Sequence, residues 1–269
     1  MKILAITAAA LIGSGAAAPA ASFPETVRAI QAADYRGERA KLQALARVLE
    51  TGKDSKLEAY RHYWRGFALW RRALNGFNES PMPGDLEQDL RAGIAAFQSA
   101  LVARPDWVEA RIGIMGCAGP LLFLARGDAA RTDSVMKDYL PVVRAVNETG
   151  ADNPRALWLQ GQTQLGAPPP YGGHPEKAAA TFERGVDAAV AEARRAADEP
   201  SWVPRWGGAE NLMNLAYVYT HSALVSRDLA LAYAQGALVA APDWHYVRDI
   251  LLPRILELAR PAVPEVTKP

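Results

Sequence analysis

Apolar residues recur at helical spacing along almost the whole chain, and the apolar–polar alternation that marks a half-buried strand is missing. Segments rich in Gly and Pro divide this pattern into paired runs, each long enough for an amphipathic helix. The pattern predicts helices at residues 24–33, 37–50, 55–74, 85–103, 108–125, 132–147, 154–165, 175–197, 209–224, 228–240 and 246–259. Pro120 lies inside one of these runs and is expected to kink or divide it. The chain is therefore predicted to be all-α.

An eight-residue sequence occurs twice with one change, as Ala100–Trp107 and Ala237–Trp244. Each copy ends a helical run, stops at a proline and restarts with Asp and Trp. A duplicated helix ending of this kind predicts a repeat array rather than an irregular bundle.

Residue spacing in the second helix of several pairs resembles that of the tetratricopeptide repeat (TPR). In that repeat a small residue is followed by an aromatic residue four positions later, a small residue three further and a proline five beyond. The matches are Gly93, Phe97, Ala100 and Pro105 in full, Ala230, Ala234, Ala237 and Pro242 with alanine replacing the aromatic, and Ala178, Phe182 and Gly185 without the proline. Small residues let helices approach closely, the ring fills the gap between pairs, and the proline ends the helix.

The first helices of the pairs resemble the repeat less closely. Gly66 and Gly161 take the place of the TPR glycine, whereas His62 and Leu157 stand where tryptophan is usual. The resemblance covers roughly residues 55–244. It implies a right-handed α-solenoid of about five antiparallel helix pairs with a C-terminal capping helix, in which stacked pairs share one core. The Pro-rich loop before residue 175 also resembles secreted bacterial TPR-like proteins.

The N-terminus has the pattern of an export signal. Lys2 precedes an apolar run of about ten residues, and Ala18 and Ala20 fit a cleavage site after Ala20. We therefore expect a signal peptide at residues 1–20, a TPR-like helical domain at 21–260 and a disordered tail at 261–269. No later stretch looks apolar enough for a membrane anchor, because charged residues interrupt each candidate. The expected location is the periplasm or the exterior.

Charge and composition exclude several functions. The formal net charge is +1 and acidic residues are scattered among the basic ones, which disfavours nucleic acid as a partner. A single cysteine, Cys117, cannot form an internal disulfide and is expected to be a small buried hydrophobe. No motif for catalysis, nucleotide binding or metal ligation occurs, so we expect neither a catalytic residue nor a metal nor a cofactor.

Aromatic side chains supply the candidate binding residues. Two Gly- and Pro-rich loops, 166–173 and 199–208, interrupt the array, and long loops of this kind are often functional. Aromatic rings and Arg carry much of the energy at binding interfaces. The candidates are Tyr63, Trp70, Trp158 and Tyr217 on first helices, and Tyr171, His174, Trp202, Arg205 and Trp206 in or beside the loops. Alternatively, the tryptophans fill gaps between imperfectly stacked repeats.

Three functions follow from these features. The first is an exported, non-catalytic scaffold that binds a protein or an extended peptide on its concave face. The second is a small-ligand-binding accessory component of an envelope transporter, which a deep pocket between the two loops would favour. The third is an enzyme, which would need His174, Arg205 and Glu210 to converge there.

Overall fold

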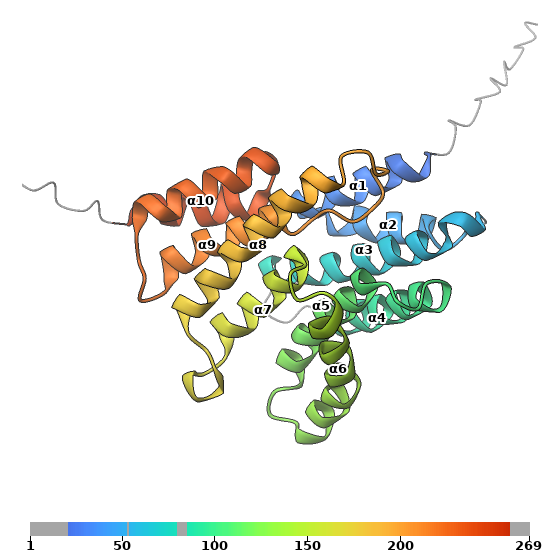
Figure 1. The fold of residues 1–269 in the computed structure, drawn as a ribbon, viewed down its shortest axis with the longest axis horizontal. Helices are drawn as coiled ribbons and strands as arrows, with labels where there is room; N and C mark the ends of the chain where they lie inside the picture. Colours follow the sequence, from blue (N-terminus) through green and yellow to red (C-terminus); the bar gives the residue numbers. More distant parts are fainter. Residues whose placement is uncertain (1–20, 53, 80–84, 259–269) are drawn as a thin grey trace, which may run out of the picture.

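The computed structural model describes residues 21–52, 54–79 and 85–258, and across them the chain forms helices and no strand (Figure 1). The α-helices are α1 (Phe23–Tyr35), α2 (Arg39–Val48), α3 (Glu58–Glu79), α4 (Leu86–Ala103), α5 (Val108–Ala125), α6 (Ala129–Thr149), α7 (Pro154–Gly166), α8 (Pro175–Arg195), α9 (Gly208–His221), α10 (Arg227–Ala240) and α11 (Leu252–Glu257). Short 3₁₀ turns lie at Ser55–Leu57 and Pro169–Tyr171, and a π-helical turn at Tyr246–Leu251 leads into α11. The predicted all-α solenoid of helix pairs with a terminal helix is confirmed.

Successive helices pack as hairpins, from α1–α2 to α9–α10. The first helices of neighbouring hairpins also touch, since α1 contacts α3, α3 contacts α5, α5 contacts α7 and α7 contacts α9. This is the packing that the TPR-like spacing predicts, with one row of first helices and one row of second helices.

Rings packed on glycines fix the distance between helices, as the spacing predicts. A Cβ at Gly66 would lie 3.0 Å from the Phe97 ring, and one at Gly161 would lie 2.3 Å from the Phe182 ring. In each case the glycine lies on the first helix of a hairpin and the ring comes from the second helix of that hairpin. Because any side chain larger than hydrogen would displace the ring, these two glycines allow the close approach of the paired helices.

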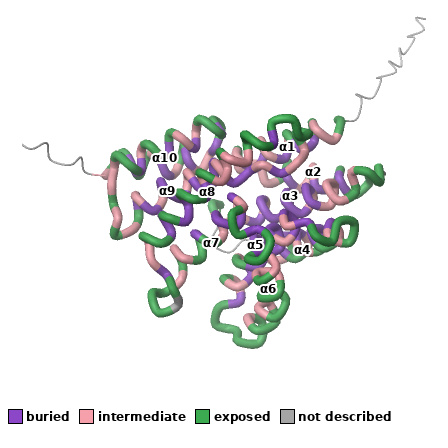
Figure 2. The backbone as a smooth tube through the Cα atoms, viewed as in Figure 1, coloured by how far each residue is buried: buried purple, intermediate pink, exposed green. Residues whose placement is uncertain are grey.

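The first and last hairpins also meet. The ring of Tyr35, at the end of α1, lies 4.9 Å from that of Trp244, and its hydroxyl donates a hydrogen bond to Glu210 of α9. Arg36 pairs with Asp243 at 2.6 Å. Burial is concentrated in the helices between these ends, above all around α3, α4 and α5 (Figure 2).

Helix α3 is longer than predicted. The sequence places its end at Leu74 and a loop from residue 76, but the helix continues to Glu79. Gly76 is buried against Leu86, and Arg39 packs beside it, donates to the Arg72 carbonyl and pairs with Glu79. These tertiary contacts offset the low helix propensity of glycine and asparagine in this turn.

Helix α5 bears on two predictions. It runs unbroken from Val108 to Ala125 through Pro120, so the proline does not divide it. It is also long and apolar enough to cross a membrane by length and composition, contrary to the expectation that charges interrupt every such stretch. Most of it is buried among neighbouring helices, as expected for the core helix of a folded domain. The predicted signal peptide at 1–20 and tail at 261–269 lie outside the described residues.

Candidate functional site

The stack of hairpins is interrupted between α6 and α7. Helix α2 packs on α3, α4 on α5 and α8 on α9, so each of these second helices covers the following first helix. Helix α6 packs on α5 but scarcely touches α7, although both helices lie wholly within the described residues. Only Val146 of α6 is buried. The flanks of α5 and α7 therefore lack the cover that a regular array would give them.

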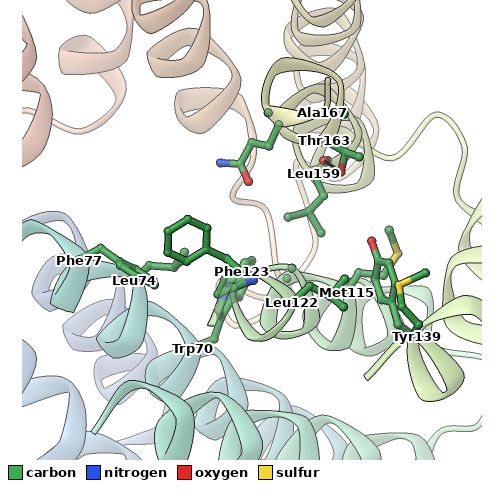
Figure 3. Close-up of a pocket in the computed structure, with 16 residues that line it drawn as sticks. Trp70, Leu74, Phe77, Met115, Leu122, Phe123, Tyr139, Leu159, Thr163 and Ala167 are labelled. Carbon is green, nitrogen blue, oxygen red and sulfur yellow. Dashed lines mark hydrogen bonds between the residues drawn. The ribbon is translucent and has the colours of Figure 1, made fainter. Parts of the chain in front are cut away.

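An apolar pocket with a volume of about 750 Å³ occupies this gap. It is lined by Trp70, Leu74 and Phe77 of α3, Met115, Gly116, Gly119, Pro120, Leu122 and Phe123 of α5, Met136 and Tyr139 of α6, and Leu159, Gln162, Thr163, Gly166 and the adjoining Ala167 of α7. Phe77 and Leu74 lie at one end, Tyr139 at the other, and Leu159 across from the α5 residues (Figure 3). Small-molecule sites commonly span roughly 300–1,000 Å³, so the pocket has a suitable size.

The chemistry of the lining is that of a binding site for an apolar molecule. None of its sixteen residues, all described, carries a charge at neutral pH. Burial raises the pKa of Tyr139, so its phenol stays neutral at physiological pH. Trp70 is fully buried, and its indole N–H has no hydrogen-bond partner among the described residues. Without a nucleophile or a paired acid and base, these residues can orient a ligand but do not form a catalytic arrangement.

One aromatic residue stands at the mouth of the pocket. Phe123 is 45% exposed although it is a large hydrophobic residue, and the guanidinium of Arg126 lies 3.9 Å from its ring centroid. The edge of Phe123 also meets Phe77 of α3. An exposed ring held by a cation and a second ring adds apolar contact area to the pocket.

A buried charge network supports one wall of the pocket. Arg155 at the start of α7 donates to Glu109 of α5 at 2.6 Å, to Glu192 of α8 and to the Trp206 carbonyl. Burial opposes the charge on Arg155, but the two carboxylates raise its pKa overall. The network ties α5, α7, α8 and the α8–α9 loop together, and the Trp206 ring that it positions packs on Trp70 of the pocket lining.

Four of the predicted site residues form one aromatic cluster. Tyr63, Trp70 and Trp158 come from first helices, and Trp206 from the α8–α9 loop lies against the rings of Trp70 and Trp158. The Trp206 N–H donates to the Tyr63 hydroxyl at 2.8 Å. All four side chains are buried. They therefore fill the space between first helices, as expected if the tryptophans fill gaps between imperfectly stacked repeats. Of the four, only Trp70 borders the pocket.

The other predicted site residues lie apart from one another. Trp202 packs on Phe23 at the start of α1, and its backbone carbonyl accepts a hydrogen bond from the Trp64 indole N–H. Tyr217 stacks on His221 and lines a smaller pocket of about 260 Å³ with Gln162, Leu165, Met213, Asn214 and Tyr246. The side chain of Tyr171 lies outside the described part of the chain.

The three residues named for an enzyme do not converge. His174 precedes α8 as its N-cap, Arg205 pairs with Glu199, and Glu210 accepts from the Gly207 N–H and from Tyr35. The two Gly- and Pro-rich loops line different pockets, since residues 166–167 border the large pocket and residues 199–204 a separate one near Tyr60. Among the described residues, no group of His, Cys, Asp and Glu could hold a metal ion.

Sequence reasoning missed most of the lining. Met115, Gly119, Phe123, Met136 and Tyr139 were not among the candidates, because each has an ordinary helical position. One signal was available: beyond Glu109 and Arg111 in its first turn, α5 has no charged residue, which suits a helix surrounded by others. Such a helix beside a poorly buried α6 implies an uncovered apolar flank.

No family model matches the chain, and no curated protein matches it. Among solved structures, the HusA haemophore from Porphyromonas gingivalis is similar, with a TM-score of 0.54 and 19% identity over 78% of this chain and 92% of that chain. A thermophilic TPR protein from Thermus thermophilus gives a TM-score of 0.42 and 15% identity over 71% of this chain and 91% of that chain. At these identities the likeness to the haemophore concerns the fold alone.

Proposed function

We propose that the protein binds one small, mostly apolar molecule in the pocket between α3, α5, α6 and α7, without catalysing a reaction. The observation that carries the proposal is the scarcity of contact between α6 and α7, which leaves an uncharged cavity of about 750 Å³ inside an otherwise continuous array. An apolar cavity of this size open to water is costly unless a ligand or a partner covers it.

A small ligand fits these contacts better than an extended peptide. All the candidate rings on the first helices except Tyr217 are buried, and the α8–α9 loop crosses the first helices through Trp202 and Trp206. The lining of the pocket offers few hydrogen-bonding groups, whereas a peptide backbone needs many. The similar haemophore, by its name a protein that carries haem, supports a small-ligand role on the same fold.

Peptide binding is the second proposal, on one observation. Gln162 lines both the large pocket and the smaller one near Tyr217, so the two are separated only by α7. A peptide lying across α7 would place apolar side chains in both. A Tyr217→Ala variant distinguishes the proposals, because it weakens such a peptide but leaves a ligand confined to the large pocket unaffected.

A titration with three probes, haem, protoporphyrin IX and palmitate, tests the leading proposal. We expect saturable binding of at least one probe at one molecule per chain, measured by quenching of tryptophan fluorescence and by calorimetry. Leu159→Asp places a carboxylate in the pocket and should weaken binding at least about tenfold, since burying an unpaired charge costs more than about 1.4 kcal/mol.

Leu229→Asp on α10 is the matched control, because Leu229 is 43% exposed and lies outside the pocket lining. It should bind each probe as the unaltered protein does. Failure of all three probes to bind, or equal binding by the Leu159→Asp variant, would rule out the proposed function.

Export to the periplasm or the exterior is part of the same proposal. The proposed export depends on the signal-like pattern of residues 1–20. A protein that carries a small ligand outside the cytoplasm would need such export. Fractionation of cells that express the full chain, with N-terminal sequencing of the product, should yield a mature chain beginning at Ala21.

A further inference from the structure

Glycines recur along α5 at intervals of three residues: Gly113, Gly116 and Gly119. Two of them are covered by flat rings. A Cβ at Gly113 would lie 2.3 Å from the ring of Phe97, and one at Gly116 would lie 2.2 Å from the ring of Trp70. Each ring therefore lies directly on the helix backbone, at a distance that only glycine permits.

The third glycine has nothing over it. Its two chain neighbours and the backbone of α5 aside, no heavy atom lies within 4 Å of the place where a Cβ of Gly119 would be, and Gly119 belongs to the lining of the pocket. A helix-interior glycine costs about 0.5–1 kcal/mol relative to alanine, and no other helix packs on Gly119 to give a reason for it. The approach of a ligand to the backbone is such a reason.

The surroundings of Gly119 are suited to a flat conjugated ring. Trp70, Phe77, Phe123 and Tyr139 bring aromatic side chains to the same pocket, and stacked or edge-to-face contacts with a ring add to simple burial. The fully buried Trp70 also brings an unpartnered N–H to the pocket lining. An acyl chain would gain nothing from a bare glycine, because it has no flat face to lay on the backbone.

We infer that the ligand is a flat conjugated ring system of porphyrin type, and that one of its faces lies on Gly119 of α5 as Trp70 lies on Gly116 and Phe97 on Gly113. This inference rests on the proposed function, since it names the class of ligand and its place in the proposed pocket. Leu159 and Thr163 of α7, across the pocket from α5, would contact the opposite face (Figure 3).

The test compares metal-free protoporphyrin IX with palmitate on three forms of the full chain: unaltered, Gly119→Ala and Gly119→Leu. Omitting iron removes coordination by Tyr139, Met115 or Met136 from the comparison. We expect the unaltered protein to prefer the porphyrin, Gly119→Ala to bind it about fivefold more weakly, and Gly119→Leu at least about tenfold more weakly. Palmitate binding, where measurable, should change less than about threefold in Gly119→Ala.

Gly236→Ala is the matched control, a glycine of α10 where an added Cβ would make only ordinary contacts, the nearest at 3.5 Å. It should bind the porphyrin as the unaltered protein does. Thermal unfolding shows that the variants fold, and Gly119→Ala should melt no lower than the unaltered chain.

The outcomes separate the inference from the proposed function. Porphyrin binding that Leu159→Asp abolishes but Gly119→Leu leaves intact would overturn the inference and keep the pocket as the site. Palmitate binding without porphyrin binding would likewise overturn the flat-ring class alone. Binding of neither probe, and of no haem either, by the unaltered protein would overturn both.

Discussion

Among the described charged side chains, Arg155 connects the largest number of different segments by hydrogen bonds. Its side chain is 1% exposed, and its guanidinium contacts two carboxylates and one carbonyl from three other segments. A buried guanidinium is stable only when its donors are satisfied, and Arg155 donates through Nε and both terminal nitrogens. Its rigid fork, rather than charge alone, therefore positions Glu109, Glu192 and Trp206.

Arg155→Lys should destabilise the protein by about 3 kcal/mol, because a lysine keeps the charge but cannot make the forked contacts and leaves two carboxylates poorly paired. Urea unfolding monitored by circular dichroism measures the change. The control is Arg184→Lys, which alters an exposed pair with Asp152 and should shift the free energy of unfolding by less than about 0.5 kcal/mol. Equal effects of the two substitutions would show that the Arg155 network is unimportant.

A partly buried tyrosine makes the fold sensitive to alkali. Burial, with a smaller contribution from Tyr217, raises the pKa of Tyr246 to about 12, above its value of about 10 in an unfolded chain. The stabilisation is therefore complete below about pH 10 and is lost as the pH rises toward 12, by up to about 1.4 kcal/mol per pH unit. Tyr246→Phe should unfold with a shallower loss of stability between about pH 10 and 11.5 than the unaltered chain. Parallel profiles would contradict this account of Tyr246.

At the scale of single residues, the sequence predicts whether a side chain is buried better than it predicts which distant residue that side chain contacts. Cys117 is buried as its small apolar surroundings predict, and His62 is partly buried within its aromatic helix. The placement of Trp206 could not be predicted, because it depends on the α8–α9 loop returning to Tyr63, 143 positions earlier in the chain. Periodicity contains no information on such a long-range contact.

Helix pairs in this protein are spaced by rings that lie on glycines. Phe182 of α8 lies on Gly161 of α7, and Phe97 of α4 lies on Gly66 of α3 and on Gly113 of α5. Contacts of phenylalanine rings with glycines therefore set the distance between helices both within a hairpin and between neighbouring hairpins. The TPR-like spacing in the sequence marks all of these positions except Gly113, which explains why the fold could be predicted.

Gly161→Ala should destabilise the protein by about 1–3 kcal/mol, although alanine is the better helix former, because the added methyl would overlap the Phe182 ring. Adding Phe182→Leu should recover part of this loss. Gly119→Ala, where no atom from outside α5 is nearby, should instead be neutral or stabilising by up to about 1 kcal/mol. Chemical denaturation of the four proteins measures these differences, and a loss at Gly119 equal to that at Gly161 would refute the packing argument.

The pocket could not be predicted from the helices, although nearly all of those helices were. Each helix is a local property of periodicity and caps, as with Asn153 before α7, whose side chain accepts from the Arg155 N–H. Whether α6 reaches α7 is instead a property of the whole stack. The end of α3 could not be predicted for the same reason, because contacts from Arg39 near Gly76 keep the helix going beyond its predicted end.

The array as a whole has its two ends in contact. Tyr35 packs on Trp244 and bonds Glu210, and Asp34 pairs with buried Arg71 of α3 at 2.7 Å. Contacts between distant repeats increase cooperativity beyond that of an open solenoid, whose repeats are coupled only to their neighbours. The pocket opens where the neighbouring hairpins α5–α6 and α7–α8 are poorly coupled.

Unfolding should therefore be a single transition. Tryptophan fluorescence reports on the cluster of Trp70, Trp158 and Trp206, while circular dichroism reports on all helices, so the two urea midpoints should coincide. Tyr35→Ala removes the contact between the ends and should lower the shared midpoint. Separate midpoints in the unaltered protein would mean that its halves unfold independently.

Methionine methyl groups allow the most direct measurement of the central claim, that a ligand occupies the pocket between α3, α5, α6 and α7. Of the five methionines, Met115 and Met136 line this pocket and Met213 lines the smaller one. In ¹³C-methyl NMR spectra, saturating protoporphyrin IX should shift the Met115 and Met136 signals through ring currents and leave Met213 in place. A shift of Met213 alone, or saturation without any shift of Met115 and Met136, would contradict the account.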